Sequence, residues 1–355
     1  MKRIVLTGGG TAGHVTPNIA LLPVLKREDF DIHYIGSLNG IESRLIPDFD
    51  IPYYGIATGK FRRYFDLKNF SDPFRVMKGY FEARKLLKMI HPDVVFSKGG
   101  FVSVPVIRAA ASLKIPCIIH ESDMTPGLAN RLCIPVSQKI CCNFPETMRG
   151  LPPGKAVLTG TPIRSELTMG NPEAAYKLCN FTKDKPVIMI IGGSQGSASI
   201  NQTVREALPK LLPDFQIIHL CGKDKVDNLM LSIEGYKQFE YVKQELKDLF
   251  SIADLVVSRA GANAICELLA LEKPNILIPL SAGSRGDQIL NANSFEEQGF
   301  SIVIKEEALD IDILTEKIHF LYENRMEYKK TMARSEQLNS IPKIMELIEE
   351  VCQHN

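Results

Sequence analysis

Three glycine-rich segments are candidate binding sites for phosphate groups. Residues 7–14 read TGGGTAGH, residues 97–105 read SKGGFVSVP and residues 191–197 read IGGSQGS; each follows a short run of β-forming residues and precedes a helical pattern. Glycine lets the backbone approach an anion closely, and the start of a helix supplies N–H groups that have no partner within the helix. The segments therefore predict phosphate-binding loops, although each is also compatible with a plain tight turn.

The first segment also matches the GxGxxG fingerprint of dinucleotide-binding proteins, through Gly8, Gly10 and Gly13. That fingerprint expects an acidic residue about 20 positions further on, near the end of the second strand, to bind a ribose. Here the second strand is expected to end at residues 34–37, and Asp31 lies at its beginning. The pattern argues against NAD or FAD, and no cofactor is expected.

His14 is the candidate general base of the first segment. An imidazole at the entrance of a helix lies where the positive end of the helix dipole disfavours protonation. Such a histidine stays neutral and can accept a proton from a reacting hydroxyl. The alternative is a histidine that caps or packs within the loop.

A second polar group, HESD at residues 120–123, ends another expected strand and leads through Pro126 and Gly127 into a helix. Side chains at the carboxyl ends of parallel strands point toward the place where ligands bind. The group therefore predicts part of a site, and a network of turn and cap hydrogen bonds is the alternative.

The second half of the chain offers groups that could bind a sugar or a ribose. Residues 258–267 read SRAGANAICE and place Glu267 in the first turns of a helix, where its carboxylate could accept hydrogen bonds from both ribose hydroxyls or complement the helix dipole. A later helix carries Asn291 and Asn293, which could contact a sugar or face solvent.

These groups need strands and helices to bring them together. Apolar runs of strand length alternate with helical segments in two series, the first at 3–7, 32–35, 93–96 and 117–119 and the second at 186–191, 216–220, 254–257 and 275–278. Runs that are apolar on both faces are typical of buried parallel strands. Proline and glycine are densest at residues 150–165, between the series. The sequence predicts an α/β protein of two Rossmann-like, doubly wound domains that face each other across a cleft.

Composition excludes several classes of function. With 42 Lys and Arg against 41 Asp and Glu, the net charge of +1 gives no field that favours nucleic acid. The eight cysteines form no CxxC pair and the seven histidines have no metal-ligand spacing, so we expect reduced thiols, no metal site and a cytosolic protein. Asp310 and Asp312 indicate a helix start. We expect neither a signal peptide nor a membrane-spanning segment.

The motifs, taken in order, resemble those of the MurG family of glycosyltransferases. They are GGGTAGH, GGFVS, HESD, GGSQG, SRAGANAICE and DQILNA, and the resemblance extends from Met1 to about residue 305. The resemblance implies a GT-B fold and the inverting transfer of N-acetylglucosamine from UDP-GlcNAc to the C4 hydroxyl of the MurNAc of lipid I. The product would be lipid II, made for peptidoglycan at the cytoplasmic face of the bacterial cell membrane by a peripheral protein.

The resemblance also implies which domain binds the donor and which binds the acceptor. Residues 161–339 would form the donor domain, and residues 1–160, joined by the last helix at 340–355, would form the acceptor and membrane-facing domain. The donor site would comprise Thr11, Ala12, Gly13, Arg164, Ser194, Val242, Ala262, Asn263, Ala264, Ile265, Cys266, Glu267 and Gln288, with Glu267 on the ribose. The acceptor site would comprise Gly99, Gly100, Ser103, His120 and Glu121.

Two departures from the family pattern bear on catalysis. Many relatives have Gln-Asn where this chain has Ser122-Asp123. Asp123 can accept a hydrogen bond or act as a base but, when ionised, cannot donate as an amide does, so the base is either His14 or Asp123. Ala12 stands where many relatives have glycine, which matters only if the position needs a positive φ.

The expected helix at residues 74–90 has two unlike sides. At about 100° per residue, Val76, Tyr80, Ala83, Leu87 and Ile90 form a core stripe. The other side carries Phe74, Met77 and Phe81 interleaved with Lys78, Arg84, Lys85 and Lys88, and KFRRYF at 60–65 repeats the mixture. We predict a patch that docks on an anionic membrane surface; the alternative is a solvated charged face whose aromatic residues pack on a neighbouring helix.

Two rival functions stay open. One is another enzyme of this architecture, such as a glycolipid synthase or a UDP-sugar epimerase. The other is a non-catalytic protein that binds a nucleotide-sugar or a dinucleotide, for which His14 would be dispensable.

Overall fold

A computed structural model of the chain describes residues 1–59, 68–193, 195–281 and 286–353, with the side chains of the helix at 68–90 described from Phe74 onward. The chain forms two compact units. Unit 1 comprises Met1–Arg164 and Asn339–Asn355, and unit 2 comprises Ser165–Leu338. Unit 1 is therefore built from both ends of the chain.

Unit 1 contains a sheet of seven parallel strands. Their spatial order is β3 (Tyr53–Ile56), β2 (Asp31–Ser37), β1 (Arg3–Thr7), β4 (Val94–Ser97), β5 (Cys117–Glu121), β6 (Lys139–Cys142) and β7 (Ala156–Leu158). The central strands are nearly continuous apolar runs because helices cover both of their faces. The strand order reverses between β1 and β4, and ligands of such sheets bind at the carboxyl ends of the strands on either side of this switch point.

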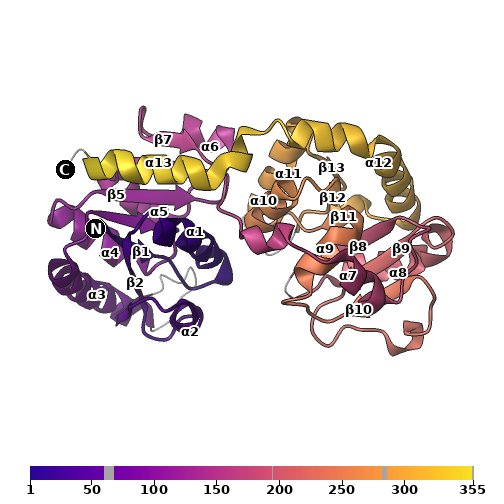
Figure 1. Cartoon of the computed structure of the whole chain (residues 1–355), viewed down its shortest axis with the longest axis horizontal. Coiled ribbons are helices and arrows are strands. Elements are labelled where there is room, and N and C mark those ends of the chain that lie inside the picture. The colour runs from indigo at the N-terminus through magenta and orange to yellow at the C-terminus, as the bar shows by residue number, and fades with distance from the viewer. Residues whose placement is uncertain (60–67, 194, 282–285, 354–355) are drawn as a thin grey trace. The chain divides into compact units, whose positions relative to one another are not determined.

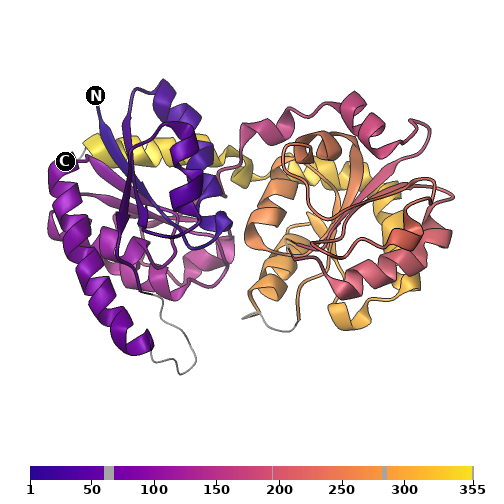
Figure 2. The ribbon, with the colours of Figure 1, turned by 90° about the horizontal axis from the view of Figure 1, so that it is seen from below.

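Helices pack on both faces of this sheet (Figures 1 and 2). The longer ones are α1 (Thr16–Arg27), α3 (Lys68–Ile90), α4 (Ser103–Ser112) and α13 (Ser340–Gln353), and the shorter ones are α2 (Glu42–Leu45), α5 (Leu128–Cys133) and α6 (Pro145–Arg149). One core joins Leu21 of α1 and Ile348 of α13 to the strands. A second core joins Leu87 of α3 and Val106 of α4 to the strands.

Unit 2 contains a sheet of six parallel strands. Their spatial order is β10 (Tyr236–Phe239), β9 (Gln216–Leu220), β8 (Val187–Ile191), β11 (Ala253–Ser258), β12 (Asn275–Leu277) and β13 (Ser301–Val303). The order reverses between β8 and β11, which gives this sheet its own switch point.

The helices of unit 2 are α7 (Pro172–Cys179), α8 (Ala198–Leu211), α9 (Leu246–Ile252), α10 (Ala262–Ala270), α11 (Asp287–Glu297) and α12 (Ile311–Met332). One core joins Val204 of α8 and Ile318 of α12 to the strands. Asp310 accepts a hydrogen bond from the N–H of Ile313 at 2.7 Å, which confirms the predicted helix start. The predicted class, two α/β units with doubly wound parallel sheets, is also confirmed. Within the described ranges, no helix has the length and apolar character needed to cross a bilayer.

Candidate active site

The first glycine loop follows β1 at the switch point of unit 1 and ends in the 3-10 turn Ala12–His14. The Nδ1 atom of His14 lies 3.0 Å from the carbonyl oxygen of Gly9 and 3.1 Å from Oγ1 of Thr11. A carbonyl oxygen only accepts hydrogen bonds, so Nδ1 carries the proton and Nε2 is the basic nitrogen. Ala12 lies in the 3-10 turn and is not a residue of positive φ, so the position tolerates alanine.

The imidazole of His14 is half-buried and neutral. Burial and then the charge of Lys98 lower its pKa to about 4, against smaller opposite effects of the Gly9 hydrogen bond and of Glu42. A neutral ring with a basic Nε2 can accept a proton at physiological pH. A negatively charged ligand nearby would raise this pKa and strengthen the base.

A buried glutamate that the sequence reasoning missed holds the first loop. Glu42 of α2 is fully buried, and its Oε2 accepts a hydrogen bond from the N–H of Gly10 at 3.0 Å. Its Oε1 accepts from the N–H of Ser37 at 3.0 Å and from the Ser37 hydroxyl at 2.5 Å. The only signal in the sequence was an acidic residue shortly after the second strand, where a dinucleotide fold would use it on a ribose.

The second glycine loop, after β4, contacts the first one. The N–H of Gly9 donates to the carbonyl of Gly99 at 3.3 Å. A Cβ atom on Gly100, whose φ is +85°, would lie 2.3 Å from the Gly9 carbonyl oxygen, and one on Gly99 would lie 3.7 Å from Cδ2 of His14. The buried Ser103 donates its hydroxyl to the Gly99 carbonyl at 2.8 Å. Of the three predicted acceptor residues of this loop, Gly99 therefore lies beside His14, while Gly100 packs on Gly9 and Ser103 bonds Gly99.

His120 and Glu121 are buried and bonded within unit 1. The Nζ atom of Lys98 lies 2.8 Å from Nδ1 of His120, and Nε2 of His120 donates to the Gly160 carbonyl at 2.8 Å. Burial and the Lys98 charge hold the pKa of His120 well below its usual value. The structure favours the alternative that the sequence left open, because these side chains form a network that positions the loop after β5.

The Glu121 carboxyl group shows how this loop is held. Its Oε1 accepts from the N–H of Asp123 at 3.0 Å, and its Oε2 accepts from the N–H of Gly127 at 3.0 Å and from Nδ2 of Asn130 at 2.8 Å. Burial raises the pKa of Glu121. Asp123, the second candidate base, is half-buried in this loop, and the preceding Ser122 accepts a hydrogen bond from Lys98.

The third glycine loop follows β8 at the switch point of unit 2. A Cβ atom on Gly196, whose φ is +68°, would lie 1.8 Å from the carbonyl oxygen of Cys221, so only glycine fits there. Ser197 caps α8 by accepting a hydrogen bond from the N–H of Ile200 at 3.3 Å. Ser194, a predicted donor ligand, lies outside the described residues.

A partly buried ion pair supports this third loop. Arg259, which follows β11, donates from Nη2 to Oγ of Ser197 at 2.7 Å and to Oε1 of Glu306, and from Nη1 to the Ile278 carbonyl at 3.1 Å. Glu306 also accepts from the Ser199 hydroxyl at 2.7 Å. The pair thus ties together the loops that follow β8, β11 and β12.

The remaining predicted donor residues differ in exposure. In α10, Ala262, Ile265 and Cys266 are buried, whereas Asn263, Ala264 and Glu267 are half-buried. The segment therefore has a core side and a more accessible side that carries Glu267. Val242, after β10, is buried, and Arg164, which is half-buried, is counted with unit 1.

Two amides on α11 bond the segments that follow β11 and β12. The Oε1 atom of Gln288 accepts a hydrogen bond from the N–H of Leu280 at 3.0 Å. Asn291 is buried and donates from Nδ2 to the Ala260 carbonyl at 3.3 Å. Its Oδ1 atom has no hydrogen-bond partner among the described residues. A buried amide oxygen of this kind is suited to receive a ligand hydroxyl.

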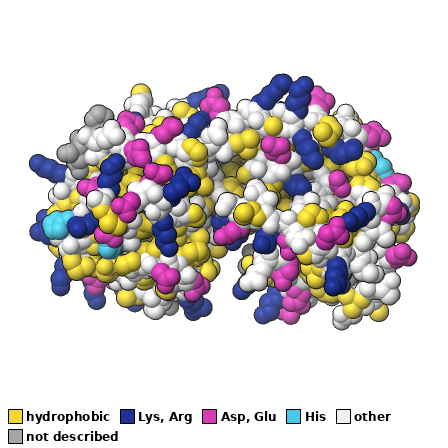
Figure 3. Space-filling model, viewed as in Figure 1, with side chains coloured by type: hydrophobic (Ala, Val, Ile, Leu, Met, Phe, Trp, Pro, Cys, Tyr) yellow, Lys and Arg dark blue, Asp and Glu magenta, His cyan; other side chains and the backbone are white. Residues whose placement is uncertain are grey.

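The exposed side of α3 carries the predicted membrane residues. Phe74 is 80% exposed, Met77 57% and Phe81 61%, while Ala83, Leu87 and Ile90 of the core stripe are buried. Lys78 and Lys85 are also exposed. Figure 3 shows basic side chains beside hydrophobic ones over α3, at the lower left. The KFRRYF segment at 60–65 lies outside the described residues.

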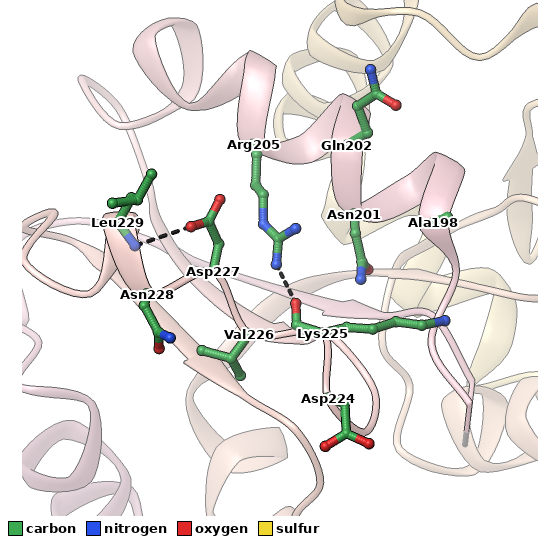
Figure 4. Close-up of a pocket in the computed structure, with 10 residues that line it drawn as sticks. All are labelled: Ala198, Asn201, Gln202, Arg205, Asp224, Lys225, Val226, Asp227, Asn228 and Leu229. Carbon is green, nitrogen blue, oxygen red and sulfur yellow. Dashed lines mark hydrogen bonds between the residues drawn. The ribbon is translucent and has the colours of Figure 1, made fainter.

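A surface pocket of about 550 Å³ in unit 2 contains none of the predicted site residues. It lies between α8 and the loop after β9, and Figure 4 shows Arg205 pointing to the backbone of Lys225, to whose carbonyl it donates at 2.5 Å. Among the described residues, no group of three His, Cys, Asp or Glu side chains is placed to hold a metal ion. None of the eight cysteines, all of which are described, forms a disulfide bond.

Family comparisons match both units. Residues 4–141 match the N-terminal domain of glycosyltransferase family 28, and residues 187–348 match its C-terminal domain. A relative from Lachnospira eligens is 62% identical over 99% of both chains, and one from Clostridium botulinum is 57% identical over 98% of this chain and 99% of its own. Both are named UDP-N-acetylglucosamine--N-acetylmuramyl-(pentapeptide) pyrophosphoryl-undecaprenol N-acetylglucosamine transferase.

Solved structures agree with this assignment. MurG of Acinetobacter baumannii is 26% identical, with a TM-score of 0.79 over 99% of this chain and 100% of its own. UDP-GlcNAc 2-epimerase from Neisseria meningitidis has a TM-score of 0.72 over 100% of both chains but only 16% identity, a likeness that concerns the fold alone. The GT-B fold is thus confirmed. Because both domain models and the near-full-length identity point the same way, the chain belongs to glycosyltransferase family 28.

Proposed function

We infer that the chain transfers N-acetylglucosamine from UDP-N-acetylglucosamine to lipid I, the undecaprenyl-linked N-acetylmuramyl-pentapeptide, and so makes lipid II. The observation that carries this inference is the identity of 62% and 57%, over nearly the whole length, to relatives that bear the name of this reaction. The motifs after β1, β4, β5, β8 and β11 support it, because they place a neutral imidazole and glycine loops at the two switch points.

In the proposed reaction, Nε2 of His14 accepts the proton of the C4 hydroxyl of the acceptor. The hydroxyl oxygen forms a bond to the anomeric carbon as the bond to the UDP oxygen breaks on the opposite face, which inverts the anomeric centre. The electron pair leaves with the diphosphate. Asp123 is the alternative base, and its place after β5 keeps it in the same loop cluster.

The donor is proposed to bind on unit 2. Backbone N–H groups of the third glycine loop and the start of α8 would stabilise the departing diphosphate. Glu267 would accept hydrogen bonds from the ribose hydroxyls, and Gln288 with Asn291 would receive the sugar. Thr11, Ala12 and Gly13 remain predicted donor contacts from unit 1, where Thr11 and Ala12 are exposed.

Transfer itself is the first test. Radiolabelled N-acetylglucosamine should move from UDP-GlcNAc to a lipid I analogue, and analysis of the sugar should show no epimerisation. Glu267→Gln should raise KM for the donor about tenfold or more, since a ribose contact would be lost. Glu297→Gln, at an exposed site of α11, should leave KM unchanged. A labelled epimer without lipid product would overturn the proposal.

We also propose that unit 1 docks on anionic lipid at the cytoplasmic face of the membrane through the exposed side of α3. Three large apolar side chains exposed beside lysines support this, because apolar burial and charge attraction act together at an interface. A Phe74→Ser/Phe81→Ser variant should sediment less with anionic vesicles than the wild type at fixed salt. Phe320→Ser/Met326→Ser, at exposed positions of α12, is the matched control. Equal sedimentation of the two variants would refute the docking surface.

A further inference from the structure

Glu42 occupies a closed pocket beside the first glycine loop. Its side chain is fully buried, and its hydrogen-bond partners among the described residues are all donors, namely the N–H of Gly10, the N–H of Ser37 and the Ser37 hydroxyl. Three donors directed at two oxygens suit an acceptor-only carboxylate. The sequence predicts that this loop binds the phosphate of a ligand. In the structure, the carboxylate of Glu42 accepts a hydrogen bond from the loop instead.

Glycines form the wall of this pocket. A Cβ atom would lie 2.3 Å from Cδ of Glu42 if placed on Gly9, 2.3 Å from Oε1 if placed on Gly40, and 2.8 Å from Cγ if placed on Gly36. Real Cβ atoms do not approach other heavy atoms this closely, so a side chain at any of the three positions would displace Glu42 or its neighbours. The fit shows that the pocket is built around this one carboxyl group.

The pocket is joined to the catalytic histidine through the backbone. His14 bonds the carbonyl of Gly9, and the adjacent Gly10 bonds Glu42, so the carboxyl group and the imidazole hold neighbouring residues of one short loop. The Gly9 N–H is bonded in turn to Gly99 of the second loop. Removal of the carboxyl group would free the N–H groups of Gly10 and Ser37 and leave space for the loop to shift.

We propose that Glu42 is a positioning residue that sets the first glycine loop, and with it His14, by occupying the place where a phosphate would otherwise bind. The Gly10 N–H is thereby removed from ligand binding, and this part of the loop supports His14 instead of a phosphate. The effect on turnover rests on the proposed transferase function, whereas the effect on the loop itself does not.

Chemical rescue tests the proposal. Glu42→Ala deletes one methylene carbon and the carboxylate, which together have the size of acetate. Turnover should fall about 10²-fold, as expected when a catalytic group is misplaced by about 1 Å, while KM for UDP-GlcNAc changes little. Acetate should restore kcat severalfold, and chloride at the same ionic strength should not. Glu42→Gln, which replaces an acceptor oxygen by a donor, should lose kcat and gain nothing from acetate.

The matched control is Asp93→Ala. Asp93 also accepts a backbone hydrogen bond, from the N–H of Arg3 at 2.6 Å, but at the opposite end of the β1 and β4 strands. This variant should keep wild-type kcat and show no response to acetate. The contrast separates a carboxylate that positions the site from one that only completes a backbone hydrogen bond.

Hydrogen exchange of the peptide that covers residues 8–14 supplies a readout without activity. The Gly10 amide should exchange faster in Glu42→Ala and Glu42→Gln, and acetate should slow exchange only in the alanine variant. If wild-type transfer is absent but exchange behaves as described, the proposed function fails and the positioning role stands. Two outcomes would overturn the role of Glu42. One is a folded Glu42→Gln variant whose Gly10 amide exchanges at the wild-type rate. The other is a Glu42→Ala variant in which acetate restores neither kcat nor the slow exchange of Gly10.

Discussion

The first and third glycine loops have the same local pattern, a buried strand followed by glycines and a helix. The side chains that support the two loops have opposite charges. The first loop bonds its Gly10 N–H to the carboxyl group of Glu42, 32 positions away. The third loop is supported through the Ser197 hydroxyl by the guanidinium of Arg259, 62 positions away. The carboxylate near the third loop, Glu306, bonds Arg259 and serine hydroxyls instead. We propose that the charge that distant residues place beside a glycine loop decides whether the loop binds phosphate or supports a catalytic group.

The largest expected effect concerns the first loop. His14→Ala should lower kcat about 10²-fold or more, because the proton acceptor for the acceptor hydroxyl is lost. Burial and Lys98 lower the pKa of His14 to about 4, so the base is neutral above that pH and protonated below it. The kcat/KM of the wild type should therefore stay level as pH falls to about 5 and decline through about 4.

Surface His319→Ala, in unit 2, is the control for this series and should keep the wild-type profile. If His14→Ala retained turnover and the same acid limb, the base would be Asp123, and Asp123→Asn would then show the loss. Either result tells whether the first loop carries the base or only supports it.

A smaller effect is expected at the third loop. Burial alone would raise the pKa of Glu306, but hydrogen bonds from Arg259, Ser199 and Ser281 outweigh it and lower the pKa to about 2. Glu306→Gln should reduce the free energy of unfolding of unit 2 by about 2 kcal/mol at pH 7, since the pair lies near the surface and water screens part of it. Urea denaturation measures the difference.

The difference in stability between the wild type and Glu306→Gln should depend on pH in one direction. A carboxyl group whose pKa is lower in the folded state than its usual 4.5 stabilises the fold above pH 4.5 and loses this contribution as pH falls toward 2. The wild type and Glu306→Gln should therefore converge in stability across that window. A difference that stays constant down to pH 2 would show that the carboxylate charge is not what supports the loop.

The smallest effect is expected when one glycine of the first or third loop is replaced by alanine. Gly10 has φ +86° and Gly193 has φ +89°, and a Cβ atom on either would meet nothing within 4 Å. Alanine at each position should cost about 1 kcal/mol of backbone strain. Gly154→Ala, with φ +77° and equally open space, is the control. Thermal unfolding should show the same loss of stability for the three alanine variants. If kcat then falls for Gly10→Ala only, the first loop is the one that supports catalysis.

The central strands of both sheets could be predicted from the sequence, whereas several outer strands could not. Strands β1, β4, β8 and β11 are apolar runs because they are buried on both faces. The edge strands β3 and β10 are only partly buried, and their mixed residues YYGI and YKQF carry no clear strand signal. A partly covered strand is defined by its hydrogen bonds to a neighbour, which the sequence does not display.

The site was predictable where its chemistry is local. His14, the glycines and Glu267 lie within short motifs whose spacing has a physical meaning. Glu42, Lys98 and Glu306 act on residues far away in the chain. The ring of His120, a predicted acceptor contact, bonds Lys98 and the Gly160 carbonyl, which the motif did not indicate. Which partner a polar side chain chooses depends on tertiary packing, so motif spacing alone cannot assign it.

The last helix, α13, has a consequence for how the protein is made. Its residues Ile344, Ile348 and Val351 belong to the same core as Ile4 and Leu6 of β1, and its Ser340 hydroxyl bonds the Thr161 carbonyl at 2.9 Å. On the ribosome, all of unit 2 emerges before this helix does. Unit 2 can therefore fold first although its strands follow those of unit 1 in the chain, while the unit that carries His14 stays incomplete until α13 has been made.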